Sequence, residues 1–178
     1  MNQVRQALRA ATARHHERVD RAFATFDLGD AGSYRAFLLA HARVLPTAEN
    51  AIHVAWDGWV RRSPLLLEDL ADLGAVADPL PKNLPMTEPA AQWGCLYVLE
   101  GSRLGGAVLA KRVGAGLPSR YLSAGHVDDS WRAFLKALEA AATSADTSWI
   151  EIAVAAARSV FESFEDAAKQ ELGRVRGR

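Results

Sequence analysis

Three glycines interrupt a regular helical pattern in the stretch LYVLEGSRLGG, which spans residues 96–106. The apolar residues of this stretch recur at helical spacing, but each glycine costs about 1 kcal/mol relative to alanine inside a helix. Close approach of the backbone to another helix or to a flat ligand is the expected compensation, because Gly101 and Gly105 lie about one turn apart and lack Cβ atoms. The stretch is not a phosphate-binding loop, since the G-x-x-x-x-G-K-[ST] arrangement is absent.

Helical spacing continues through the rest of the chain, and runs of β-branched residues with period two are missing. We therefore predict an all-α protein. Ser33, Ser63 and Thr87 are expected to cap helices, and Pro46 is expected to kink or divide the second helix. Three prolines predict a loop over residues 78–85. The predicted helices cover residues 2–26, 34–59, 65–73, 88–113, 129–142 and 148–172.

The composition is typical of one globular domain. Of the 178 residues, 49% are hydrophobic and 24% are charged, and the 21 basic and 21 acidic side chains balance. This balance excludes binding of nucleic acid or an anionic membrane by net charge. The single cysteine, Cys95, excludes a disulfide framework and fits a reducing compartment. Neither a signal peptide nor a run of about 18 apolar residues is present. We expect one cytoplasmic domain over residues 1–178, with a flexible basic tail over 173–178.

The first predicted helix carries two adjacent histidines. Leu8, Thr12, His16 and Asp20 follow one another at intervals of four residues and therefore lie along one stripe of the helix. A neutral histidine that faces inward in an all-α domain is a candidate axial ligand of haem iron. His15 is the alternative, because at about 100° per residue it lies nearer the centre of the apolar face. The helical geometry alone favours His15.

Two cations at helical spacing form a further candidate site. Arg132 and Lys136 lie four residues apart and follow Trp131. Such a pair can clamp a carboxylate, although the same pattern is also typical of a solvent-exposed helix face. In the last predicted helix, Phe161 and Phe164 are expected to point inward.

Taken together, these residues resemble the haem oxygenase family, in particular the small bacterial enzymes found with bacteriophytochromes. The resemblance spans most of the chain. The first helix of that family carries L-[KR]-x-x-T-x-x-x-H, which here reads Leu8-Arg9-x-x-Thr12-x-x-x-His16. Its distal helix is kinked at G-[DS]-x-x-G-[GA], which here reads Gly101-Ser102-Arg103-Leu104-Gly105-Gly106. The preceding LYVLE is also close to the bacterial form.

The resemblance implies a helical bundle that holds haem between the first helix and the glycine-kinked helix. It implies that His16 is the axial ligand, with His15 as the alternative. The distal, catalytic side of haem is implied to consist of Gly101, Ser102, Gly105 and Gly106. The residues expected to bind haem around its ligand and its propionates are Arg9, Thr12, Arg132, Lys136 and Phe164.

The implied reaction is the oxygen- and electron-dependent cleavage of haem to biliverdin, ferrous iron and CO. Haem is then both cofactor and substrate, and the implied partners are oxygen, a reductase or ferredoxin, and a bacteriophytochrome that receives biliverdin. Ser102 stands where many members have an aspartate that orders water, so the aspartate-based proton relay does not carry over. Two other functions stay open at this point: a haem carrier or sensor without turnover, and a helical protein–protein module without haem.

Overall fold

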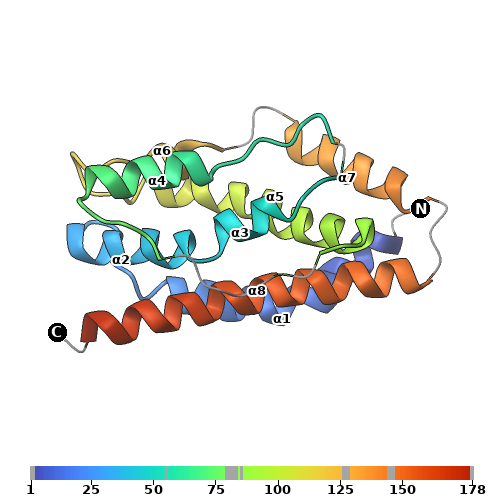
Figure 1. Cartoon of the computed structure of the whole chain (residues 1–178), viewed down its shortest axis with the longest axis horizontal. Helices are drawn as coiled ribbons and strands as arrows, with labels where there is room; N and C mark the ends of the chain where they lie inside the picture. The colour runs from blue at the N-terminus through green and yellow to red at the C-terminus, as the bar shows by residue number, and fades with distance from the viewer. Residues whose placement is uncertain are drawn as a thin grey trace.

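The structure, a computed structural model, describes residues 3–54, 56–78, 84, 86–125, 129–143 and 147–176. Every regular element in this part of the chain is an α-helix (Figure 1), which confirms the predicted fold class. The helices are α1 (Gln3–Phe23), α2 (Ala31–Ala42), α3 (Leu45–Asn50), α4 (Ser63–Asp72), α5 (Pro89–Ala110), α6 (Arg120–Ser123), α7 (Ser130–Ala141) and α8 (Thr147–Arg176).

The long helix α8 supports both α1 and α5. Each of these two helices packs extensively on α8, whereas contact between α1 and α5 themselves is sparse (Figure 1). A glycine allows α5 to approach α8 closely, because a Cβ atom on Gly94 would lie 2.0 Å from the carbonyl oxygen of Ala153. The two helices that carry the sequence motifs are therefore fixed by a common partner and leave space between them.

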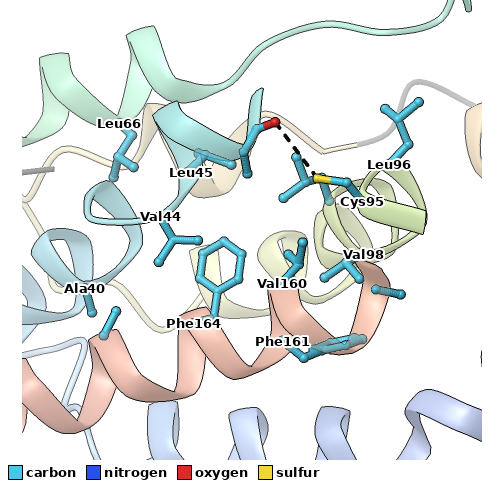
Figure 2. Close-up of a cluster of buried hydrophobic side chains, with 14 of the residues drawn as sticks. Ala40, Val44, Leu45, Leu66, Cys95, Leu96, Val98, Val160, Phe161 and Phe164 are labelled. Carbon is cyan, nitrogen blue, oxygen red and sulfur yellow. Dashed lines mark hydrogen bonds between the residues drawn. The ribbon is translucent and has the colours of Figure 1, made fainter. Parts of the chain in front are cut away.

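Apolar side chains from α8, α5 and the α2–α3 region form the centre of the core. Figure 2 shows Val160 and Phe164 of α8 with Val44 and Val98 in this cluster. The thiol of Cys95 is buried there and donates to the carbonyl oxygen of Ala48 at 3.9 Å. Burial raises the pKa of the Cys95 thiol well above its ordinary value, so this cysteine is a core residue.

Several helix ends differ from the prediction because other residues supply the caps. Asp30 caps α2, since its Oδ1 accepts the Ser33 backbone N–H at 2.8 Å. Pro46 divides the second predicted helix, as expected, and α3 then ends at Asn50 rather than near Trp59. Ser63 is the first residue of α4 instead of its cap.

The ends of the two longest helices also differ from the prediction. Helix α5 begins at Pro89 after Glu88, not directly after Thr87, and runs unbroken through its three last glycines to Ala110. Helix α8 continues to Arg176, so most of the predicted tail is helical. Most of the predicted loop at 78–85, as well as residues 177–178, lies outside the described residues. None of the helices in the described part of the chain is long and apolar enough to span a lipid bilayer.

Candidate functional site

A cavity of about 710 Å³ lies where α1, α5 and α8 leave space between them. Its volume is typical of pockets for small molecules and cofactors, which measure roughly 300–1,000 Å³. Most of the side chains around it are apolar. The candidate residues that line it are Arg9, Thr12, His16, Gly101, Ser102, Gly105, Gly106, Phe161 and Phe164. The structure thus brings together motifs that are about 85 residues apart in the sequence.

On the α1 side, His16 and His15 face different surroundings. His16 lines the cavity, and its Nδ1 lies 3.0 Å from Oδ2 of Asp20, one turn along the helix. Its ring meets Phe161 of α8 edge-on, with 5.8 Å between the ring centroids. His15 Nε2 instead lies 3.3 Å from Oε1 of Glu162 on α8. The apolar-face argument that favoured His15 therefore identifies the histidine that packs on α8, and His16 is the one that reaches the cavity.

On the α5 side, the glycines leave backbone exposed to the cavity. A Cβ atom on Gly105 would meet no other atom within 4 Å, so the space above this residue is open. A Cβ atom on Gly106 would lie 3.3 Å from the carbonyl oxygen of Leu122, and one on Gly101 would lie 3.7 Å from the Trp131 ring. Gly105 is thus the position where the missing side chain gives room to a ligand, whereas Gly106 gives room to the neighbouring chain.

A buried arginine forms the polar corner of the cavity beside Ser102. Arg62 Nη2 donates to Ser102 Oγ at 2.7 Å and to the Leu99 carbonyl oxygen at 2.9 Å. Ser102 Oγ in turn donates to that same carbonyl at 2.7 Å. Arg62 Nε is buried and makes no hydrogen bond to any described residue. Burial lowers the pKa of Arg62 from its ordinary value, but an arginine stays charged in proteins.

Arg62 was not predicted from the sequence, since it lies 40 residues before Ser102 and belongs to no motif. His41 and Tyr121, which line the same cavity, were not predicted either. His41 Nδ1 lies 2.9 Å from the Phe37 carbonyl oxygen, so Nδ1 carries the proton and Nε2 is an acceptor. Burial lowers the pKa of His41 to about 4, and this histidine is neutral near pH 7.

A cation and a phenol lie together at another edge of the cavity. Arg9 and Tyr97 both line it, and Tyr97 hydrogen-bonds to Thr12. Thr12 Oγ1 donates to the Leu8 carbonyl oxygen at 2.7 Å, so the phenol is the donor to Thr12. Burial raises the pKa of Tyr97, while the positive charge of Arg9 opposes this rise. The phenol thus stays protonated, and its single proton is engaged by Thr12.

The two candidate cations of α7 do not reach the cavity wall. Arg132 and Lys136 are both exposed, and Arg132 Nη1 pairs with Oδ1 of Asp129 at 3.4 Å. The inner face of α7 is occupied by Trp131, Phe134, Leu135 and Leu138. Arg132 and Lys136 lie outside this inner face of the helix and do not line the cavity. Their contact with the ligand therefore stays a prediction.

This arrangement fits a flat and mostly apolar ligand that carries a metal and acidic groups. An imidazole lies on one wall, glycine backbone lies on the other, and a cation lies at one edge. Because Asp20 accepts from His16 Nδ1, the lone pair of Nε2 is available to a metal. Haem has each of these properties.

Comparisons with known proteins agree with this geometry. No protein-family model matches the chain. Over 152 residues, the chain is 35% identical to a haem oxygenase of Xanthomonas campestris pv. campestris (strain 8004), and the match covers 76% of this chain and 88% of that protein. The chain belongs to the haem oxygenase family. The solved structure of the NO- and CO-bound haem oxygenase from Neisseria meningitidis has the same fold, with a TM-score of 0.79 and 24% identity over 96% of this chain and 92% of that one.

Membership in the haem oxygenase family decides among the functions that the sequence left open. The chain is an enzyme that cleaves haem, and haem is its substrate as well as its cofactor. The reaction uses oxygen and electrons from a reductase. The interpretations as a haem carrier and as a module without haem are therefore set aside.

Proposed function

We propose that haem lies in the cavity between α1 and α5, with His16 as its axial ligand. The observation that carries this proposal is that His16 and the open backbone at Gly105 line the same cavity. Asp20 holds the proton of His16 on Nδ1 and directs Nε2 to the iron. When bound, haem supplies the oxygen chemistry, and the chain supplies binding, orientation and control of water.

At the edge of the cavity, Arg9 binds a haem propionate. A guanidinium is a donor that suits a carboxylate. Tyr97 lies at the same edge, where its phenol is held in place by the hydrogen bond to Thr12. The contact of Arg9 with the propionate fixes the rotation of haem in its plane and thereby selects the meso carbon that faces the reacting oxygen. Phe161 and Phe164 of α8 cover the apolar part of the ring.

On the distal side, Gly105 leaves room for oxygen and Gly101 and Gly106 let α5 lie close to its neighbours, while Ser102 and Arg62 order water. The proton of Ser102 is engaged by the Leu99 carbonyl, so Ser102 acts as an acceptor that orients Arg62. Arg62 lines the cavity, and its guanidinium is then the positive group that orients water at this corner. This pair takes the part that an aspartate has in many members of the family.

We further propose that the biliverdin formed by this enzyme supplies a bacteriophytochrome. The support is the resemblance of residues 96–106 to the small bacterial enzymes that are found with these photoreceptors. The same resemblance supports one haem oxygenase domain over residues 1–178, and the single cysteine supports the cytoplasm as its compartment.

An absorption titration with hemin, followed by reduction in air, tests the proposed function. We expect a saturable one-to-one Soret band, which decays into a biliverdin spectrum when a reductase or ascorbate is added. A Soret band that survives reduction in air would contradict turnover, and the absence of a band would contradict the proposed haem site.

A further inference from the structure

Arg103 lies in the middle of the distal motif, yet it does not line the cavity. Its side chain is only 7% exposed. The guanidinium makes hydrogen bonds in three directions: Nε donates to Oε1 of Glu100 at 2.9 Å, Nη1 donates to the Ala124 carbonyl oxygen at 3.3 Å, and Nη2 donates to the Val60 carbonyl oxygen. It also lies over the Trp59 ring, 5.9 Å from the ring centroid. These contacts hold the buried Arg103 guanidinium in one place and link α5 to two other segments of the chain.

Two of these bonds reach segments that form the polar corner of the cavity. Val60 belongs to the non-helical segment before α4 and lies two residues before Arg62. Ala124 follows α6 and lies three residues after Tyr121, whose ring is 5.3 Å from the Arg62 guanidinium carbon. Arg103 thus ties both the segment that carries Arg62 and the segment that supports it to α5.

The other restraints on Arg62 come from its own neighbours. Glu49 accepts the backbone N–H of Arg62 at 2.7 Å and that of Ser63 at 3.1 Å, so the chain is fixed on the side of α4. On the N-terminal side of Arg62, the hydrogen bond from Arg103 to the Val60 carbonyl oxygen fixes the chain. From this backbone position the Arg62 side chain reaches Ser102 and Leu99.

We propose that Arg103 is a positioning residue for haem cleavage. It holds the Arg62 guanidinium within hydrogen-bond distance of Ser102 at the distal side of the cavity. The inference rests on the proposed role of Arg62 as the group that orders distal water. Small displacements of such a group have large effects, since a shift of about 1 Å can change a rate by about 100-fold. The planar fork of arginine is needed because a lysine ammonium cannot reach a carboxylate and two separate carbonyls at once.

The test compares Arg103→Met and Arg103→Lys with the control Arg112→Met, which removes an exposed arginine just beyond α5. Three properties are measured on each purified protein: hemin affinity from the Soret titration, the rate of biliverdin formation at saturating hemin, and the proportions of the biliverdin isomers. We expect Arg103→Met to bind hemin one to one with near wild-type affinity, to react about tenfold more slowly and to yield altered isomer proportions. The rate and isomer proportions of Arg103→Lys should lie between those of Arg103→Met and the wild type, and Arg112→Met should match the wild type in all three properties.

The pH at which the spectrum of the ferric haem complex changes gives a readout independent of turnover. We expect this midpoint to move in Arg103→Met, because Arg62 is displaced, and to stay in Arg112→Met. The charged and titratable groups that face Arg62 are Arg103, Glu100, Glu49, the Tyr121 phenol and His41. If Arg103→Met does not fold, the double variant Glu100→Leu/Arg103→Leu removes the buried charges together and should show the same changes.

A parallel variant, Arg62→Met, separates this inference from the proposed function. If Arg62→Met changes the rate, the isomer proportions and the midpoint but the Arg103 variants leave all three at wild-type values, Arg103 is only structural and the inference is wrong. If Arg62→Met also leaves all three unchanged, the proposed distal role of Arg62 is wrong as well.

Discussion

At the scale of single residues, the neighbours His15 and His16 show how one helical step separates a packing role from a binding role. His16 has a carboxylate one turn away and an open cavity in front of it. His15 faces α8, where Glu162 accepts from its ring and Nδ1 is buried without a hydrogen bond to any described residue. An iron ligand needs a free nitrogen that points into a cavity, and this requirement favours His16.

His41 gives the cavity a pH dependence that can be measured on the protein without haem. Its pKa is lowered to about 4 in the folded chain, whereas that of an unfolded histidine is about 6.5. Between about pH 4 and pH 6.5 the unfolded chain takes up a proton on His41, whereas the folded chain does not. Proton uptake therefore favours the unfolded chain, and the folded chain is most stable above about pH 6.5 and loses stability as the pH falls toward 4. We expect the free energy of unfolding to fall by up to about 1.4 kcal/mol per pH unit between about pH 6 and pH 5.

Urea denaturation of the wild type and of His41→Gln over this pH range checks the prediction. The glutamine variant cannot take up the proton, so its free energy of unfolding should fall less steeply with pH, by up to about 1.4 kcal/mol per pH unit. Equal slopes for the two proteins would show that His41 does not carry the effect.

At the scale of helices, the glycines of α5 have two different functions. Gly94 allows contact with the backbone of α8, and Gly105 leaves space in the cavity. From the sequence, close approach was expected at the glycines of residues 96–106, and Gly94 was not singled out. A glycine that serves helix packing and one that serves a ligand are alike in a sequence, because the difference depends on what another helix brings opposite each of them.

Alanine substitutions should therefore have opposite effects at these two glycines. We expect Gly94→Ala to lower the free energy of unfolding by about 3 kcal/mol, since its Cβ atom collides with backbone that cannot move aside. Gly105→Ala should raise the stability of the protein without haem by up to about 1 kcal/mol, but should slow biliverdin formation because its methyl group enters the cavity. Thermal denaturation and turnover assays measure both effects, and a stabilised Gly94→Ala or a fully active Gly105→Ala would contradict this division.

The cations of α1 and α7 differ in the same way. Arg9 lines the cavity, whereas Arg132 and Lys136 are exposed on the outer side of α7. We expect Arg9→Met to weaken hemin binding by about 1 kcal/mol, or roughly fivefold in Kd, because an edge contact to a carboxylate is lost. The double variant Arg132→Met/Lys136→Met should keep the wild-type Kd in a Soret titration. If the double variant weakens hemin binding and Arg9→Met does not, the α7 pair and not Arg9 binds the propionates.

At the scale of the whole molecule, α8 is the support on which the two walls of the cavity rest. Helices α1 and α5 each pack on α8 but have little contact with each other, so haem in the proposed position would join them. We expect hemin at about 100 times its Kd to raise the free energy of unfolding by about 2.7 kcal/mol. Thermal denaturation with and without hemin checks this value, and an unchanged Tm at saturation would argue against binding between the two helices.

The fold class could be predicted from the sequence for a physical reason, whereas the pairing of the two motifs was implied by the family resemblance. The helical spacing of apolar residues is a local property of the chain, and L-x-x-x-T-x-x-x-H and the glycine motif are each contained within about three turns of helix. Helix ends such as Asp30 were less predictable, because several nearby residues compete to cap the same helix.

The polar side of the site could not be predicted, because its members come from separate segments. Arg62, His41 and Tyr121 meet Ser102 only through tertiary packing. The α7 pair Arg132 and Lys136 shows the opposite case, in which correct local spacing gave no information on which face of the helix meets the cavity. Spacing predicts which residues share a face, and the packing of neighbouring helices decides where that face points.

The most direct test of the account is the absorption spectrum of the ferric haem complex in His16→Ala and His15→Ala. If haem lies in the cavity with His16 on its iron, His16→Ala should lose the wild-type Soret spectrum and regain it when imidazole is added, while His15→Ala should keep the wild-type spectrum. A wild-type spectrum in His16→Ala together with its loss in His15→Ala would contradict the assignment of the iron ligand and the haem position built on it.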